Sequence, residues 1–224
     1  QLADVQTGDI TRTGEIYKFD LMTGIVDEFS ELQGIMGEKY ALAFGEAPAV
    51  ATAIREHYMP ISAEGELPAS QLGKLFAVSD KLDSVISFFN IDRIPSGSND
   101  PFALRRQTSG VVRILIDNEL TFDWRTDIIS ILQTVYGIED QERLVELQTA
   151  LSQFVNDRLK AILNDQEVRY DIADAVLQSR SADILRKLAA SKVLQAASEK
   201  ASFKETLEAW NRILNLGAKA RELN

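Results

Sequence analysis

Two adjacent arginines, Arg105 and Arg106, follow a turn-rich stretch at residues 96–100, and Arg113 comes about two helical turns later. Consecutive side chains on a helix point about 100° apart, so the first two guanidinium groups face neighbouring directions. The planar donor fork of arginine suits phosphate or carboxylate groups. One interpretation is contact with an RNA backbone. The other is internal ion pairing, for which the candidate acids are Asp80, Asp83 and Asp100.

A second group of cations lies near the C-terminus. From residue 176 to the end there are 9 basic and 5 acidic residues, although the whole chain has a net charge of −10. Phosphate contacts need only well-placed cations, whereas readout of splayed bases also needs stacking surfaces, which Trp210 and Phe203 offer. The same residues suit a solvated helix face and a packed apolar stripe, so both alternatives stay open. The candidate RNA contacts here are Arg186, Lys187, Lys192, Lys204 and Arg212.

The composition limits the classes of partner. With 34 acidic and 24 basic residues, the chain does not suit indiscriminate nucleic-acid binding, and we expect no DNA partner. No apolar run approaches the roughly 18–20 residues that span a bilayer, so we expect no membrane partner. The lack of cysteine excludes disulfides, thiolate zinc sites and cysteine nucleophiles, and is typical of a cytoplasmic protein. Because the chain begins with Gln1, we interpret it as a fragment or a trimmed chain.

Apolar residues recur with helical spacing along most of the chain, and no hairpin turn between strands is recognisable. We therefore predict an all-α fold. Residues 1–13 show no strong period, and the loop at 59–70 is rich in proline and glycine. A second turn-rich loop places a boundary near residue 95. Helices are predicted over 15–29, 48–58, 72–89, 102–117, 123–136, 141–163, 168–178, 181–198 and 202–216.

The segment 50–89 resembles the second half of the HD superfamily of metal-dependent phosphohydrolases. A helix ends at His57, a loop with glycine and proline follows, and the next helix carries Asp80 and Asp83. Where that superfamily has its His-Asp pair, this chain has phenylalanine and Asp20. The resemblance implies a pocket formed by these four residues. A working site of that type uses several imidazoles, and this chain has one histidine, so we expect a degenerate pocket without a metal.

Four stretches resemble, in order and spacing, the β subunit of the bacterial two-subunit glycyl-tRNA synthetase. They read KFDLMTGIVDEFSELQGIMGEKYALAFGE, IREHYMP, AVSDKLDSVISFF and IPSGSNDPFALRRQTSGVVRIL. The chain departs from the family pattern at Tyr17, Phe19 and Ser79, where the family has cysteine or alanine. The resemblance is dense over 15–116 and thinner over 117–224. It implies an HD-like domain at residues 1–95, followed at 96–224 by helices that lead into an incomplete anticodon-binding domain.

The resemblance also implies a function. The chain would bind and orient tRNA(Gly), so that its 3′ end reaches the separate α subunit, in the cytoplasm. ATP and magnesium would be used by the α subunit, and this chain would hold no cofactor and no catalytic residue. Two alternatives stay open. One is a metal-dependent HD-type nucleotide phosphohydrolase, and the other is an assembly module that docks the α subunit without touching RNA.

Overall fold

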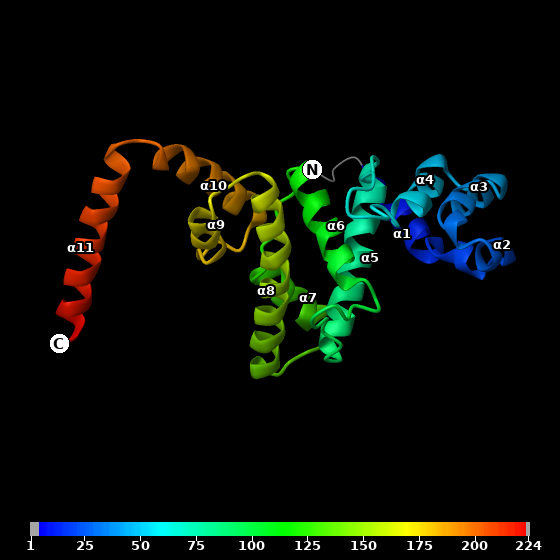
Figure 1. The fold of residues 1–224 in the computed structure, drawn as a ribbon. Helices are drawn as coiled ribbons and strands as arrows, with labels where there is room; N and C mark the ends of the chain where they lie inside the picture. The colour runs from blue at the N-terminus through cyan, green and yellow to red at the C-terminus, as the bar shows by residue number, and fades with distance from the viewer. Residues whose placement is uncertain (1–4, 223–224) are drawn as a thin grey trace. The chain divides into compact units, whose positions relative to one another are not determined.

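The computed structural model of the chain describes residues 5–222, and these residues confirm the predicted all-α fold (Figure 1). They form eleven α-helices and two 3₁₀ helices, with no β-strand in this part of the chain. The first six α-helices are α1 (Thr7–Ile16), α2 (Gly24–Glu28), α3 (Ile35–Ala43), α4 (Pro48–Glu56), α5 (Gln71–Asn90) and α6 (Leu104–Asp117). The others are α7 (Thr126–Thr134), α8 (Gln141–Asp165), α9 (Tyr170–Leu177), α10 (Ile184–Ser198) and α11 (Ser202–Glu222). The 3₁₀ helices are η1 (Phe19–Met22) and η2 (Ser30–Leu32).

The chain divides by packing into two compact units. The first comprises Gln1–Leu159 and Ala182–Leu185, and the second comprises Lys160–Ser181 and Arg186–Asn224. This division lies within α8 rather than near residue 95. Helices α5 and α6, on either side of residue 95, pack together inside the first unit. The sequence predicts a boundary near residue 95, between an HD-like domain and the helices that follow it. The division by packing does not test that boundary, which stays a prediction.

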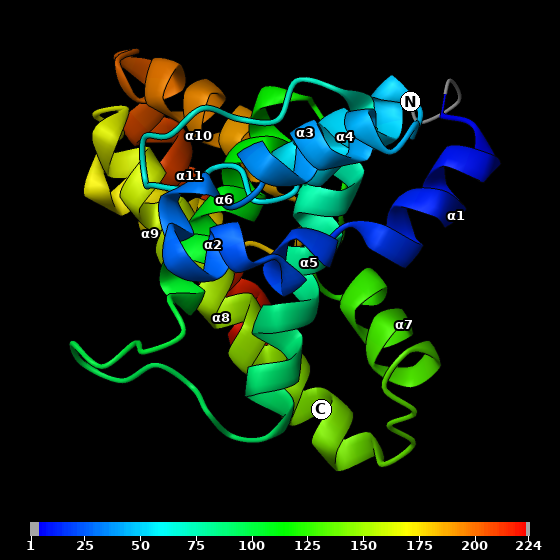
Figure 2. The ribbon, with the colours of Figure 1, turned by 90° about the vertical axis from the view of Figure 1, so that its right-hand side faces the viewer.

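In the first unit, α4 packs against α1, α3 and α5 (Figure 2). Pro48 occupies the first turn of α4, where its missing N–H is not needed. The core of this bundle contains Ala41 from α3 together with Val50 and Ile54 from α4, each at most 1% exposed. Helix α1 was not predicted, because its sequence contains few apolar residues. Its packing on α4 accounts for its stability.

The prediction of one helix over residues 15–29 is wrong. The structure has the end of α1, then η1, then the short helix α2. Thr23 is extended, with ψ of 134°, and its hydroxyl donates to the carbonyl of Asp20 at 2.6 Å. Short polar side chains that bond to nearby backbone compete with a continuous helix in this way. The break turns the Asp20 side chain into the protein.

Helices α5 and α6 form the most extensive helix pair of the first unit, side by side in Figures 1 and 2. The buried residues of α5 include Leu82, Val85, Ile86 and Phe89, which follow the three-and-four spacing of one helix face. Helix α6 buries the face that begins with Leu104. The sequence period therefore predicted both helices.

The start of α5 is joined to the end of α4 by a buried carboxylate. Ser70 caps α5 by accepting the N–H of Gly73 at 2.9 Å. Glu56, which is 3% exposed, accepts hydrogen bonds from the N–H groups of Ala69 and Ser70 at 3.1 and 2.9 Å, and from the Ser70 hydroxyl. A Cβ at Gly73 would lie 2.1 Å from a carboxylate oxygen of Glu56, so this close approach requires glycine.

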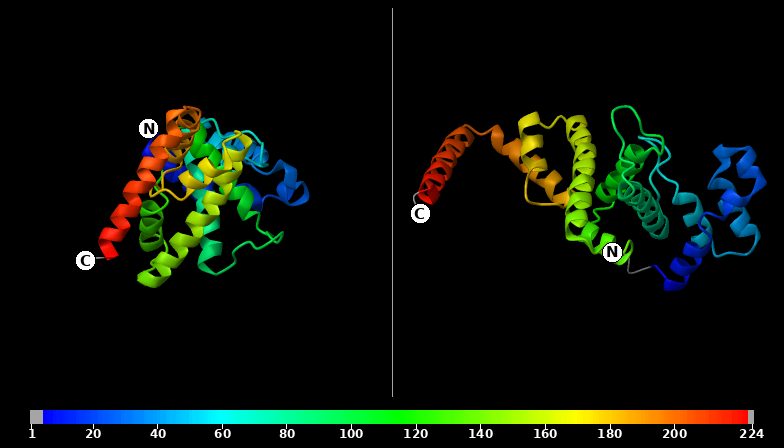
Figure 3. Two further views of the ribbon diagram at one scale, coloured as in Figure 1. Left: turned by 60° about the vertical axis from the view of Figure 1, so that its left-hand side comes forward. Right: turned by 90° about the horizontal axis from the view of Figure 1, so that it is seen from below.

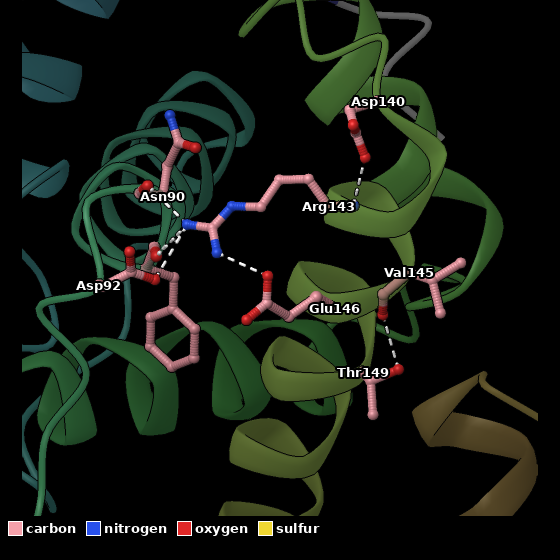
Figure 4. Close-up of polar contacts among 8 residues, drawn as sticks. Asn90, Asp92, Asp140, Arg143, Val145, Glu146 and Thr149 are labelled. Carbon is pink, nitrogen blue, oxygen red and sulfur yellow. Dashed lines mark hydrogen bonds and ion pairs between the residues drawn. The ribbon is translucent and has the colours of Figure 1, made fainter.

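The other end of α5 is held by α8 (Figure 4). The guanidinium of Arg143 donates to the carbonyl of Asn90 at 2.7 Å and to the carboxylate of Asp92 at 3.0 Å. A second nitrogen of the same group donates to Glu146 at 2.7 Å. The last carbonyls of a helix lack partners within the helix and carry partial negative charge, so a cation there is stabilising.

The second unit contains α9, α10 from Arg186 onward, α11 and the last residues of α8. Lys160 pairs with Asp174 at 2.7 Å, and the N–H of Arg169 donates to Gln195 at 3.2 Å. In the view from below in Figure 3, α11 extends beyond α10 with no other described helix of this unit beside it. Its apolar stripe is correspondingly exposed, and Trp210 is 60% exposed. No helix among residues 5–222 is both long enough and apolar enough to span a membrane.

Candidate functional site

His57 lies at the end of α4 and is fully buried. Its Nδ1 is 2.7 Å from the carbonyl of Ile54, and because a carbonyl only accepts, this nitrogen carries the proton. Its ring lies between the rings of Tyr17 and Tyr58, with centroids 5.0 and 3.7 Å away. Burial lowers the pKa of His57 from 6.5 to about 4, so the imidazole is neutral at pH 7. Its Nε2 has no hydrogen-bond partner among the described residues.

Asp20 is also fully buried, and both of its carboxylate oxygens are bonded. One accepts the backbone N–H of Gly34 at 2.7 Å, and the other accepts the hydroxyl of Tyr58 at 3.0 Å. Gly34 has φ of +76°, and a Cβ there would lie 2.8 Å from the Tyr58 ring. Glycine is therefore needed at this position for two reasons, backbone conformation and close approach. Burial raises the pKa of Tyr58, so its hydroxyl stays protonated and donates.

Asp80 on α5 is paired with a lysine that the sequence reasoning did not single out. Lys18 lies 2.5 Å from its carboxylate, and the hydroxyl of Tyr17 donates to the same oxygen at 3.4 Å. Tyr17 thus contacts His57 with its ring and Asp80 with its hydroxyl. Three of the four predicted pocket residues, Asp20, His57 and Asp80, are linked through two tyrosines.

The fourth predicted residue, Asp83, lies elsewhere. It is exposed on α5 and accepts the hydroxyl of Tyr136 at 2.7 Å. Within residues 5–222 there is no group of three or more histidine, aspartate or glutamate side chains arranged to hold a metal ion. The oxygens of Asp20 are occupied by an N–H and a hydroxyl, and Asp80 is occupied by an ammonium. These residues do not fit the ligand set of an HD metal centre.

Lys81, next to Asp80, is 5% exposed. Its Nζ donates to the backbone carbonyl of His57 at 2.9 Å. Burial lowers the pKa of Lys81 to about 8, and the positive charge of Arg106 contributes to this shift. The sequence contained a signal for this burial, because Ala77, Lys81 and Val85 are four residues apart and the two apolar ones are buried.

The arginine pair at the start of α6 has no acidic partner among the described residues. Neither the Arg105 nor the Arg106 side chain makes a hydrogen bond or ion pair within this part of the chain. The carboxylate of Asp100 instead accepts the backbone N–H groups of Leu104 and Arg105, at 2.8 and 2.9 Å. Phe102 is 45% exposed and stacks on Phe88, with ring centroids 3.9 Å apart. Two available cations thus lie beside an exposed aromatic ring.

Arg113 has a different partner. Its guanidinium donates to the carbonyls of Ala63 at 2.5 Å and Gly65 at 3.0 Å, and so fixes the loop between α4 and α5. Arg113 lies on the same helix as Arg105 and Arg106, but its guanidinium binds backbone carbonyls of the protein itself.

The predicted C-terminal contacts lie in the second unit and differ in exposure. Lys187 is 5% exposed, and its ammonium donates to the carbonyl of Leu177 at 2.9 Å. Arg186, Lys192, Lys204 and Arg212 are exposed. Arg212 also donates through Nε to the carbonyl of Glu208, one turn earlier, at 3.2 Å. Trp210, one of the two aromatic residues predicted to stack on RNA bases, lies on the exposed apolar stripe of α11.

Comparison with known proteins decides between the families. Residues 1–178 match the family described as glycyl-tRNA synthetase beta subunit. The chain belongs to this family. The resemblance drawn from the four sequence stretches is thereby confirmed.

Relatives in the β-subunit family align along almost the whole chain. The glycine–tRNA ligase beta subunit of Levilactobacillus brevis is 46% identical over 228 positions, which cover 98% of this chain and 32% of that protein. The protein of the same name from Limosilactobacillus reuteri is 47% identical over 224 positions, with 97% and 32% covered. That from Streptococcus suis is 46% identical over 215 positions, with 96% and 31% covered. The chain spans about a third of the length of these relatives.

Proposed function

We propose that this chain is a tRNA-positioning part of the glycyl-tRNA synthetase β subunit. It binds tRNA(Gly) through cations that meet backbone phosphates, and it orients the 3′ end towards the α subunit. Glycine activation, with ATP and magnesium, belongs to the α subunit in this proposal. The complete two-subunit enzyme then attaches glycine to tRNA(Gly) in the cytoplasm.

One observation carries the proposal beyond family membership. Arg105 and Arg106 have no internal side-chain partner among residues 5–222, although the chain is acidic and supplies many carboxylates. An arginine that stays unpaired in such a chain is available for an external anion, and its fork suits phosphate. The exposed ring of Phe102 beside the pair offers a stacking surface for an unpaired base.

The test is charge reversal of the pair, Arg105→Glu with Arg106→Glu, in the full-length two-subunit enzyme. We expect the dissociation constant for tRNA(Gly) to rise at least about tenfold, because two phosphate contacts become repulsive. The logarithmic salt dependence of binding should become shallower by about 0.7–0.9 for each phosphate that is no longer neutralised. The KM values for ATP and glycine in glycyl-adenylate formation should stay unchanged.

The control reverses two exposed arginines elsewhere in the same unit, Arg93→Glu with Arg125→Glu, and makes the same change in net charge. This variant should bind tRNA within about twofold of the unaltered enzyme, the effect of a general charge change at physiological salt. If both double variants bind tRNA like the unaltered enzyme, the arginine pair plays no part in RNA binding. The assembly-module alternative would then explain the chain better.

A further inference from the structure

A pocket of about 280 Å³ lies in the first unit, between the start of α6, the middle of α5 and the segment around η2. It borders the buried network described above, because Tyr58 and Asp80 line it, whereas His57 and Asp20 do not. Residues from four parts of the chain line it. Those that bear on its chemistry are Glu31, Tyr58, Lys81, Ser84, Arg106 and Gln107.

Two cations converge on this pocket. Lys81 is 5% exposed, and its ammonium uses one of its three N–H groups on the carbonyl of His57, at 2.9 Å. Arg106 is exposed at the pocket wall, and its side chain makes no hydrogen bond or ion pair within residues 5–222. A buried ammonium with unused donors is costly unless an anion compensates it.

The acids near the pocket compensate these charges only in part, because the charge of Asp80 raises the pKa of Lys81 but does not offset the effect of burial. Asp80 lines the wall, but its carboxylate is paired with Lys18 at 2.5 Å and also accepts the hydroxyl of Tyr17. Glu31 is exposed and forms no ion pair with either pocket cation. The described groups therefore leave two positive charges facing one cavity, and neither Lys81 nor Arg106 forms an ion pair with a carboxylate among residues 5–222.

We propose that this pocket binds a phosphate group, to which Lys81 and Arg106 donate N–H hydrogen bonds and Ser84 its hydroxyl. The cavity is large enough for a phosphate and part of the group attached to it. The lowered pKa of Lys81 agrees with an empty anion site, because burial, with a smaller contribution from the charge of Arg106, opposes protonation more than the charge of Asp80 favours it. A bound anion would raise that pKa again.

The phosphate has two possible sources with the same chemistry, an RNA backbone or a free mononucleotide. The first would make the pocket one contact of the proposed tRNA-binding surface. The second would make it a small-molecule site in its own right. The inference does not depend on the proposed function, because phosphate binding can be measured without tRNA.

The first experiment titrates this isotope-labelled chain with inorganic phosphate, AMP and a short single-stranded RNA at constant ionic strength. Backbone amide signals are followed by nuclear magnetic resonance. We expect saturable shifts at Lys81, Ser84 and Gln107. Arg106→Gln and Lys81→Met should each weaken binding about tenfold, the effect of losing one charge-assisted hydrogen bond. Arg125→Gln, an exposed arginine outside the pocket, should bind within about twofold of the unaltered chain.

One further variant sharpens the test. Glu31→Gln should strengthen phosphate binding, because it removes a negative charge from the rim of the pocket. If Lys81→Met fails to fold, Arg106→Gln still decides the matter, since Arg106 is exposed and its side chain supports no described hydrogen bond or ion pair. Shifts that persist unchanged in Arg106→Gln would overturn the proposal. The lack of any shift at the pocket with all three phosphate compounds would overturn it as well.

The second experiment identifies the source. The two-subunit enzyme with Arg106→Gln alone is tested for tRNA(Gly) binding. Weaker tRNA binding together with shifts in the isolated chain assigns the pocket to the RNA backbone. Shifts with unchanged tRNA binding assign it to a free nucleotide, and this result also separates the pocket from the proposed function.

Discussion

His57 shows how a residue typical of metal sites serves a purely internal role in this chain. Its ring is enclosed by two tyrosines, its proton is on Nδ1, and burial keeps it neutral. Because His57 binds a proton less readily in the folded chain than in the unfolded chain, its contribution to the free energy of unfolding is fully present above the unfolded pKa of 6.5. It is lost as the pH falls through the folded pKa of about 4.

The pH dependence of folding should therefore contain a His57 component. Between pH 7 and pH 4, the free energy of unfolding should fall about 3 kcal/mol more in the unaltered chain than in His57→Gln. Urea unfolding of both chains at several pH values measures this difference. Parallel pH profiles for the two chains would show that His57 titrates normally in the folded protein.

Residue types alone bear on one part of this chemistry, the predicted degenerate pocket, which stays a prediction. A single histidine already means that the imidazole set of an HD metal site is incomplete. The sequence did not reveal that Tyr17, Lys18 and Tyr58 occupy oxygens of Asp20 and Asp80, because aromatic and cationic partners carry no spacing signal. Lys187 was singled out for its charge, yet its helix buries it. The position of a lysine on its helix face decides its exposure, and charge counting ignores that position.

At the scale of elements, the joint between α4 and α5 depends on one carboxylate. Glu56→Ala removes the acceptor for two backbone N–H groups and the Ser70 hydroxyl. We expect the free energy of unfolding to drop by about 2–4 kcal/mol, because these donors lie where water replaces the carboxylate poorly. Thermal or urea unfolding measures the loss. Glu64→Ala, an exposed acid in the same loop, should change stability by less than about 0.5 kcal/mol.

The C-terminal end of α5 should depend on Arg143 in a more local way. Arg143→Met keeps the aliphatic length and removes the hydrogen bonds to Asn90 and Asp92 shown in Figure 4. The last turn of α5 should then open more often, so its amide protons should exchange about tenfold faster, equivalent to about 1.4 kcal/mol. Exchange at α6 amides should change much less. Equal acceleration in both helices would mean that Arg143 supports the whole unit.

The helical period predicted α5, α6 and α8 well, because each has a long apolar face that packing preserves. It was misleading over residues 15–29, where an equally regular period covers a break at Thr23. There the hydroxyl of Thr23 and the carboxylate of Asp20 find backbone partners, and these local bonds outweigh continued helix. The pocket between α5 and α6 was not predictable, since it depends on how two helices and a loop meet.

At the scale of the whole molecule, each packing unit contains one tryptophan. Trp124 in the first unit is 3% exposed, and Trp210 in the second is 60% exposed. In this chain, Trp210→Phe should leave a fluorescence spectrum at shorter wavelength that acrylamide quenches weakly. Trp124→Phe should leave the opposite, because only the exposed indole meets solvent and quencher. Equal quenching of the two variants would contradict the exposure of α11.

The division of the chain into units has a consequence for inheritance. The backbone passes between the two units at residues 159–160, 181–182 and 185–186, and the first of these passages lies inside α8. A single genetic crossover at any of them would separate pieces that share a core. We therefore expect that the two units are not exchangeable as independent pieces by a single crossover, because neither unit is one continuous segment.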